Sequence, residues 1–249
     1  MSELLYGKNP ILETFRAGRR KVLRFFHLDS TKPDAALQEA LSFCQRRKLK
    51  VGAVPRNWFE SKLPGILAQG WAAEVEEYPY VALEVLLKNT SEKKRSVLLA
   101  LDQIQDPQNL GAVLRNAEAC GVDGVLICTD RATHVTPAVV KASAGASEHL
   151  AISRVVNLSR ALEDCKAAGF WSVGTSLEAA ENALTFSWPE KTLLVLGSEG
   201  KGMRRLTHEK CDFLIRLPLL GKISSLNVAA TSAVCLYEIV RTLGLWTGK

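Results

Sequence analysis

The 249-residue sequence has no apolar run approaching the ~20 residues that a membrane-spanning helix needs. Its first five residues have neither the basic start nor the apolar core of a secretory signal, so a cytoplasmic protein is expected. The six cysteines contain no CxxC pair and lie mostly in apolar segments, which predicts reduced core residues. The four histidines lie far apart, none at metal-ligand spacing from a cysteine or carboxylate, so no metal site is expected.

Two common nucleotide-binding patterns are also missing. GxxxxGK[ST] is absent, because Gly221-Lys222 is followed by Ile223 and Arg216 stands where the first glycine would be. No GxGxxG follows a predicted strand. An ATPase, a Rossmann dinucleotide enzyme and a Rossmann-type methyltransferase are therefore disfavoured.

Positively charged residues outnumber negatively charged ones. Thirty-two Lys and Arg face 26 Asp and Glu, giving a formal net charge of +6 and a pI near 9.0. This balance favours a polyanionic partner, although charge alone does not identify one. The cations gather in three groups, at residues 16–24, 46–50 and 93–95.

The pattern of apolar residues predicts a small α/β domain at 1–88, a linker at 89–96 and a second domain at 97–249. The linker is assigned because residues 89–95 contain no apolar side chain. In the first domain a helix is expected to start at Asn9-Pro10, with Asn9 as its cap. It is followed by strands at 22–28, 51–54 and 71–75 and by helices at 34–47 and from about 57.

Strand and helix alternate through the second domain, which predicts a parallel sheet with right-handed crossovers. Residues 97–101 form a continuous apolar run, as expected of a strand covered on both faces. The other expected strands are 125–128, 170–174, 193–196 and 213–217, and the expected helices are 109–119, about 137–143, 158–168 and 225–241.

Two loops of this domain have unusual composition. The run 193–196 ends in Gly197-Ser198-Glu199-Gly200-Lys201-Gly202, whose three glycines let the backbone approach a bound molecule closely. The run 213–217 ends at Pro218 and leads to Ser224-Ser225-Leu226-Asn227 at the start of the last helix. Loops at the carboxyl ends of parallel strands are where open α/β sheets bind ligands, but both could also be ordinary turns.

These residues match a known family. The strings LGSEGKGM and LPLLGKISSLNVAATSAVCLYE resemble the second and third motifs of the SpoU/TrmH family of RNA ribose 2'-O-methyltransferases. The first motif, Asn, five residues, then Arg, is matched by Asn109 and Arg115. RRLTHEKCD and YGKNPILE resemble the RlmB-like bacterial branch, which methylates a guanosine ribose in 23S rRNA.

The resemblance implies a SPOUT fold, in which a parallel α/β methyltransferase domain carries a trefoil knot and a small N-terminal α/β domain binds the RNA substrate. It implies S-adenosyl-L-methionine as cofactor and a homodimer. The implied partner is RNA, either 23S rRNA or ribosome-assembly intermediates. Under this resemblance the linker cations at 93–95 are either RNA contacts or a solvated connector.

Family matching also assigns site residues. The backbone around Gly197, Leu217 and Leu226 is expected to contact the cofactor, and the two leucine side chains can still belong to the core. Arg115 is the catalytic candidate, as acceptor of the 2'-hydroxyl proton or, since an arginine is a poor base, as a group that holds phosphate and stabilises negative charge.

Four further polar residues are implied at the site: Asn109, Glu199, Ser225 and Asn227. Glu199 is either an acceptor for loop amides or orients the arginine or substrate. Asn109 is expected both to cap its helix and to organise the site, and Ser225 and Asn227 to cap the last helix and line the site. Ser225 could also reach a partner subunit's pocket. The branch commonly has serine where this chain has Ala229, so that hydroxyl is absent.

Two other functions remain open. The same chemistry could act on transfer RNA, because the motifs indicate the reaction and not the target. A non-catalytic RNA-binding or ribosome-assembly factor is the second alternative. The joint presence of Asn109, Arg115, Glu199, Ser225 and Asn227 argues against it.

Overall fold

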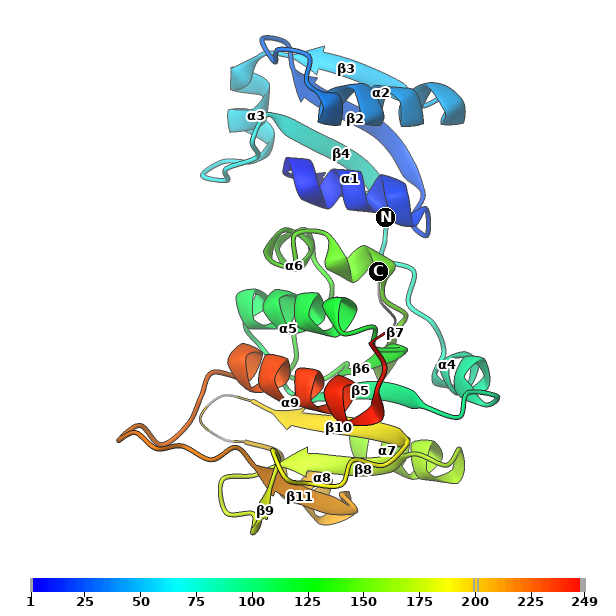
Figure 1. Cartoon of the computed structure of the whole chain (residues 1–249). Helices are drawn as coiled ribbons and strands as arrows, with labels where there is room; N and C mark the ends of the chain where they lie inside the picture. The colour runs from blue at the N-terminus through cyan, green and yellow to red at the C-terminus, as the bar shows by residue number, and fades with distance from the viewer. Residues whose placement is uncertain (1, 199, 201, 247–249) are drawn as a thin grey trace. The chain divides into compact units, whose positions relative to one another are not determined.

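The computed structural model describes residues 2–198, 200 and 202–246, and these divide into two compact units (Figure 1). Unit 1 comprises Met1–Pro79 and Val135–His149, and unit 2 comprises Tyr80–His134 and Leu150–Lys249. The division thus precedes the linker expected at 89–96. Part of that range lies in helix α4 (Leu83–Thr90), whose Leu86 is buried in the core of unit 2.

Unit 1 is a four-stranded sheet with three helices from the N-terminal segment. The strand order is β1-β4-β2-β3, in which β4 is antiparallel to both neighbours and β2 is parallel to β3. The strands are β1 (Ser2–Tyr6), β2 (Val22–Leu28), β3 (Lys50–Val54) and β4 (Trp71–Glu76), and the helices are α1 (Lys8–Ala17), α2 (Ala35–Arg47) and α3 (Arg56–Lys62). Every predicted element is present, and β1 is an addition that the sequence analysis did not predict.

Aromatic packing and caps fix these elements. Phe25 of β2 packs edge-on against Phe15 of α1 and Trp71 of β4, with ring centroids 5.7 and 5.1 Å apart. Asp34 caps α2 by accepting a hydrogen bond from the Leu37 amide. The predicted cap at Asn9 is wrong, because α1 already begins at Lys8 and its cap position is Gly7.

A buried ion pair explains why Val135–His149 belongs to unit 1. This segment holds α6 (Pro137–Ala142) and a 3-10 turn (Ala146–His149). Glu148 of the turn is buried and accepts a hydrogen bond from Arg20 at 3.2 Å. Burial raises the pKa of Glu148, although Arg20 opposes that shift. The Arg20 guanidinium also bonds to Glu3 and the Glu76 carbonyl, so β1, β4 and the 3-10 turn meet on one cation.

Unit 2 is built on a seven-stranded sheet in which all described pairings are parallel, as predicted. The order is β7-β6-β5-β10-β8-β11-β9. The strands are β5 (Ser96–Asp102), β6 (Gly124–Cys128), β7 (Ile152–Val155), β8 (Trp171–Thr175), β9 (Glu181–Asn182), β10 (Lys191–Gly197) and β11 (Phe213–Arg216). β7 and β9 were not predicted. The knotted threading implied by the resemblance stays a prediction.

Helices cover both faces of this sheet (Figure 1). Leu193 and Val195 of β10 join the core formed with α7 (Leu158–Ala167), while α5 (Pro107–Ala119) and α9 (Val228–Leu243) pack against each other. The short helix α8 (Arg205–Lys210), also unpredicted, contacts α7. β10 lies at the centre of the sheet, so its carboxyl end is flanked by loops from both sides.

Candidate functional site

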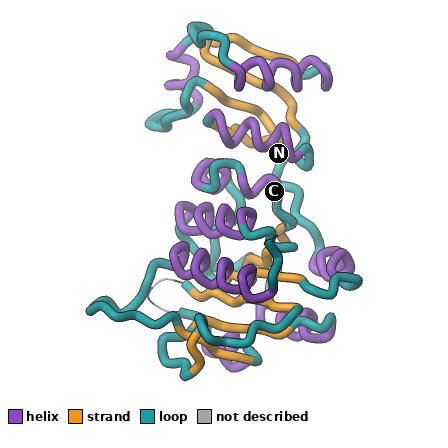
Figure 2. Tube along the Cα trace, viewed as in Figure 1, coloured by secondary structure: helices purple, strands orange, loops and turns teal. Residues whose placement is uncertain are grey.

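The site lies where β8, β10 and β11 end. These strands are parallel neighbours, so their carboxyl ends meet at one edge of the sheet. The loops that follow them, together with the long loop between β11 and α9 that projects from the sheet in Figure 2, surround a cavity of about 460 Å³. This volume is within the range that holds a drug-sized small molecule.

Each wall of the cavity comes from a different element. The β8 loop contributes Thr175 and Glu178, and the β10 loop contributes Gly197 and Ser198. The floor is one face of α9, whose contributing residues follow helical spacing: Val228, Thr231 and Cys235. The third wall follows β11, with Arg216, Leu217, Leu219, Ser225 and Leu226.

Position 197, at the end of β10, accepts only glycine. A Cβ at this position would lie 2.2 Å from the Gly202 carbonyl carbon and 2.3 Å from the Met203 nitrogen. The backbone is this close because Ser198 and Gly202 form a bridge, with N to O distances of 3.1 and 2.9 Å. The loop therefore folds back onto the strand and leaves backbone groups at the cavity.

A buried carboxylate fixes the far end of the same loop. Asp102, at the end of β5 and opposite Gly197 in register, is 1% exposed. Its two oxygens accept hydrogen bonds from the Arg204 backbone nitrogen at 2.8 Å and from Arg204 Nε at 2.7 Å. Sequence analysis did not identify this pair, and the only available signal was an acidic residue closing a continuous apolar strand.

A second polar group joins α5 to α9. Asn227 caps α9 by accepting a hydrogen bond from the Ala229 amide at 2.7 Å, as predicted, and its side-chain nitrogen donates to Asn109 Oδ1 at 2.9 Å. The predicted cap role of Asn109 is wrong. Asp106 caps α5 instead, because Pro107 starts the helix two residues earlier than expected.

Arg115 and Asn116 follow on α5. Arg115 is exposed, and among residues 2–198, 200 and 202–246 its guanidinium forms no hydrogen bond or salt bridge. Asn116 donates to the Ala229 carbonyl at 2.8 Å and to Ser232 Oγ at 2.9 Å, so it fastens α5 to the first turn of α9. Asn116 was not predicted as a site residue.

The predicted site residues therefore fall into three groups. Gly197, Leu217, Ser225 and Leu226 line the cavity. Asn109, Arg115 and Asn227 are not among its lining residues and lie on the joined α5 and α9. Glu199 lies outside the described residues. Ser225 is exposed and does not cap α9, because Asn227 fills that position.

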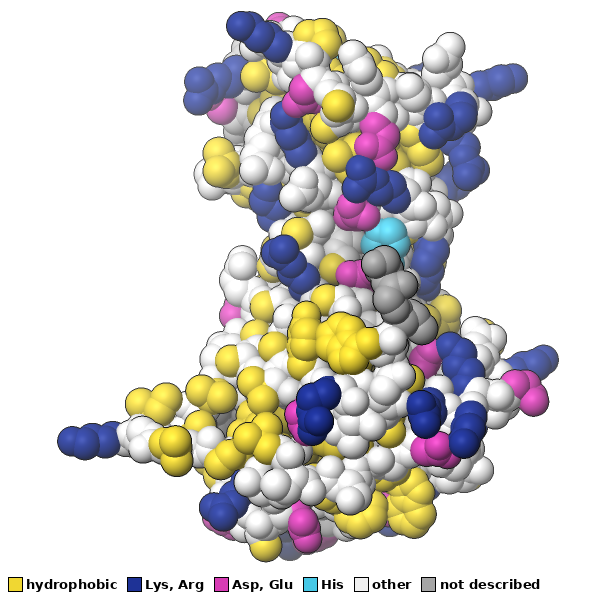
Figure 3. Space-filling view, viewed as in Figure 1, with side chains coloured by type: hydrophobic (Ala, Val, Ile, Leu, Met, Phe, Trp, Pro, Cys, Tyr) yellow, Lys and Arg dark blue, Asp and Glu magenta, His cyan; other side chains and the backbone are white. Residues whose placement is uncertain are grey.

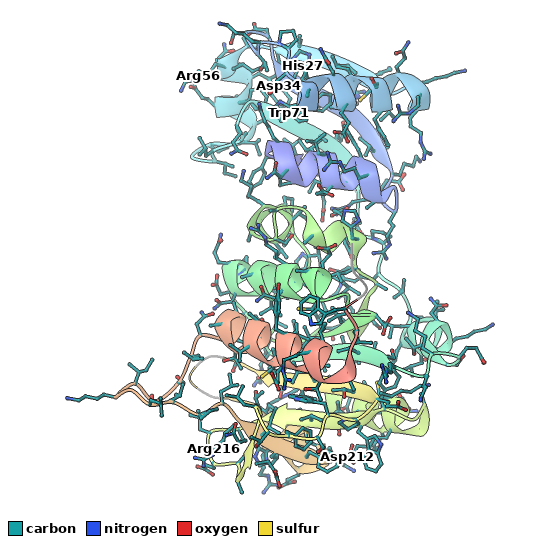
Figure 4. The ribbon with its side chains drawn as sticks, viewed as in Figure 1. His27, Asp34, Arg56, Trp71, Asp212 and Arg216 are labelled. Carbon is teal, nitrogen blue, oxygen red and sulfur yellow. The ribbon has the colours of Figure 1, made fainter. Side chains whose placement is uncertain are left out.

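Arg216 is a cation of the cavity wall that the sequence analysis did not assign to the site. It ends β11, whereas Asp212 precedes the strand, so the two labelled side chains lie at opposite ends of it (Figure 4). Arg216 forms no salt bridge within the described part of the chain. An unpaired cation at the cavity suits an anionic group on a ligand or substrate.

Thiols and metals offer no alternative chemistry among the described residues. The six cysteines are free, and burial raises the pKa of Cys165 and Cys235 to about 12, so both stay protonated near neutral pH. No group of three or more described His, Cys, Asp or Glu side chains could hold a metal ion. None of the described helices is long and apolar enough to cross a membrane.

Comparison with known proteins identifies both units. Residues 96–237 match the SpoU rRNA Methylase family, and residues 4–81 match the family described as RNA 2'-O ribose methyltransferase substrate binding. A Bacillus subtilis relative, YacO, is 39% identical over 96% of this chain and 95% of its own, and its TrmH-family name leaves the target open between tRNA and rRNA.

A further relative is more specific in its name. The 23S rRNA (guanosine-2'-O-)-methyltransferase RlmB of Yersinia pestis is 36% identical over 98% of this chain and 99% of its own. The solved structure of AviRb from Streptomyces viridochromogenes in complex with AdoMet has a TM-score of 0.79, covering 96% of this chain and 89% of that one. Its sequence identity is 24%, so it supports the fold.

Proposed function

Because this chain belongs to the SpoU rRNA methylase family, we propose that it transfers a methyl group from S-adenosylmethionine to the ribose 2'-hydroxyl of a guanosine in 23S rRNA. The reaction class is that of the family, and the named target comes from relatives such as the Yersinia pestis enzyme. One observation carries the proposal for this chain. The second and third family motifs, which follow the different strands β10 and β11, line one cavity through Gly197, Leu217 and Leu226.

The cavity fits a nucleoside-sized cofactor. Its volume is suitable, and the crowding at Gly197 keeps side chains away from one wall so that backbone groups can contact a ligand directly. We assign Gly197, Leu217 and Leu226 as cofactor-binding residues. When bound, S-adenosylmethionine supplies an electrophilic methyl group on a sulfonium.

The chain's own residues must hold the ribose and accept the charge that develops on its oxygen. Arg115 has a guanidinium that no described partner occupies, so it is free to bind the phosphate next to the target ribose and to stabilise the 2'-oxygen as it loses its proton. The hydrogen bond between Asn227 and Asn109 holds α5, the helix that carries Arg115, against the start of α9. We propose Ser225 and Glu199 as further groups that orient Arg115 or substrate.

A homodimer is part of the proposal. Helix α9 buries one face and exposes Val234 and Tyr237 on another, and Tyr237 contacts the exposed Trp246 with ring centroids 5.5 Å apart. Figure 3 shows hydrophobic side chains gathered over this region. Exposed apolar surface of this kind supports association. Sedimentation of wild type and Tyr237→Asp tests it, and a wild-type monomer would contradict it.

Methyl transfer from tritiated S-adenosylmethionine to unmodified 23S rRNA and to unmodified tRNA transcripts tests the target. We expect incorporation into 23S rRNA and recovery of 2'-O-methylguanosine after nuclease digestion. Incorporation into tRNA alone would establish the alternative target, for which the name of YacO is the support. RNA binding without cofactor binding in a titration would instead establish the non-catalytic factor.

A further inference from the structure

Unit 1 carries a group of exposed cations that lie close together in the sequence. Residues 1–79 contain thirteen Lys and Arg against nine Asp and Glu. Residues 40–59 contain five of these cations and no acidic residue. Four of the five lie together where α2 ends and β3 begins: Arg46, Arg47, Lys48 and Lys50, here called the α2–β3 basic patch.

Other cations of unit 1 are engaged by carboxylates. Lys8 pairs with Asp34 at 2.9 Å, Arg16 with Glu39 at 2.8 Å and Lys21 with Glu76 at 2.7 Å. The members of the α2–β3 basic patch are all exposed, and none forms a salt bridge with a residue that the structure describes. Arg16 and, to a smaller extent, Arg46 lower the pKa of Glu39, but the hydrogen bonds to that carboxylate come from two nitrogens of Arg16.

Helix stabilisation explains only half of the patch. Arg46 and Arg47 occupy the last turn of α2, where cations interact favourably with the helix dipole, and Arg47 also lies over the Phe43 ring at 5.7 Å. Lys50 lies beyond the helix, on β3, which is an edge strand. Its register partner on β2 is another cation, Arg24, so Lys50 gains no ion pair from that neighbour.

Lys48 is the most informative member. It ends α2 in the left-handed conformation, with φ 53°, where glycine is the residue that avoids steric cost. The backbone amides of Lys48 and Leu49 close the helix on the Gln45 and Cys44 carbonyls, at 3.2 and 2.9 Å, and a glycine would make the same bonds. The chain therefore keeps a charged side chain at a strained position, where that side chain forms no hydrogen bond or salt bridge with the described residues.

We propose that the α2–β3 basic patch binds the phosphate backbone of the RNA substrate. This inference rests on the proposed function and deepens it by naming the surface of unit 1 that holds the RNA. Four unpaired cations on a helix end and an adjoining edge strand match the charge of successive phosphates, and their binding releases counterions. Figure 3 shows Lys and Arg side chains at the right of the N-terminal unit, where α2 ends and β3 begins in Figure 1.

The test compares removal of charge from the patch with removal of charge elsewhere on unit 1. The triple variant R46Q/K48Q/K50Q leaves Arg47 and its contact with Phe43 intact. We expect it to bind 23S rRNA transcript at least about 10-fold more weakly. The plot of log association constant against log salt concentration should become less steep, by about 2 to 3 in slope. The control is Arg56→Gln, which removes a cation from the far end of β3 that lies 3.4 Å from Glu60.

Lys48→Gly separates binding from folding. We expect this variant to be at least as thermostable as wild type, because it relieves the left-handed lysine, and yet to bind the transcript more weakly with a slope lower by about 1. Equal losses in the patch variants and Arg56→Gln, or unchanged affinity and slope in Lys48→Gly and the triple variant, would overturn the proposal. In either case methylation by wild type would leave the proposed function standing, whereas its absence would count against that function alone.

Discussion

Asn227 donates a hydrogen bond to Asn109 Oδ1 at 2.9 Å, joining residues that are 118 positions apart. The same Asn227 side chain accepts from the Ala229 amide, so its orientation is fixed by the cap of α9. The first turn of α5 is thereby tied to the start of α9. This contact makes the first and third family motifs one structural group.

Arg115→Ala is expected to reduce methyl transfer by at least about 100-fold, because it removes the cation proposed to stabilise the developing oxyanion. Arg115 is exposed and does not line the cavity, so cofactor affinity and thermal stability should stay near wild type. Calorimetric titration with S-adenosylmethionine and a tritium-transfer assay measure the two effects. Wild-type activity in this variant would end the assignment.

Asn116→Ala should lower both stability and turnover. The substitution removes the hydrogen bonds to the Ala229 carbonyl and to Ser232, which costs about 1–3 kcal/mol when the partners stay buried. Because Arg115 is its neighbour on α5, we expect kcat to fall while the KM for S-adenosylmethionine is unchanged. Ser232→Ala, which removes one of the two acceptors, is the matched control and should have a smaller effect. A full kcat despite lower stability would show that the contact is only structural.

Gly197→Ala is expected to weaken cofactor binding strongly, by about 10-fold or more, because the new Cβ would lie 2.2 Å from the Gly202 backbone and the loop must move. Gly221→Ala is the control, since nothing lies within 4 Å of a Cβ there. Binding of S-adenosylhomocysteine by calorimetry compares the two. Similar affinities in both variants would contradict the role given to the tight end of β10.

The stability of unit 2 should depend on Asp212 at acid pH. Burial raises the pKa of Asp212, but hydrogen bonds from Ser172 and the nearby Lys166 ammonium together lower it by more, so the net pKa lies below its usual 3.8. The stabilisation is therefore present above the unfolded pKa and is lost as pH falls through the folded pKa.

Asp212→Asn should be less stable than wild type at neutral pH, and the difference should shrink as the pH falls through the lowered pKa of Asp212. Urea unfolding at about pH 7, 5 and 3 measures it. Asp130→Asn, at an exposed position 3.8 Å from Arg131, should change stability little. A gap that stays constant with pH would mean that the carboxylate charge is not what stabilises this site.

Local patterns predicted the sheet strands of unit 2 where burial is complete. Residues of β5 and β10 form continuous apolar runs because both faces are covered, and that signal indicated a parallel sheet. β7 is short and mixed in composition, with Ser153 and exposed Arg154 between apolar residues, so it gave no comparable signal. The glycines after β10 and the cap at Asn227 were also visible, because each reflects a local backbone requirement.

Features that depend on tertiary contacts could not be predicted from the sequence. Asp102 and Arg204 are 102 positions apart and share no motif, so only the folded chain identifies their ion pair. The polar run at 89–95 suggested a linker, but burial of Leu86 holds α4 in unit 2. The start of α5 was misplaced because Asp106 and Asn109 are both good caps, and Pro107 at the first helical position decides between them.

The central position of β10 has a consequence for synthesis on the ribosome. β5 and β8 both precede it in the chain, yet each pairs with β10 and not with the other. A nascent chain that stops before residue 191 therefore presents two facing strand edges with unpaired backbone groups, a state prone to aggregation. The central strand of the sheet is thus synthesised after both of its neighbours. Truncated or stalled products of this chain should therefore need chaperone protection that the finished protein does not.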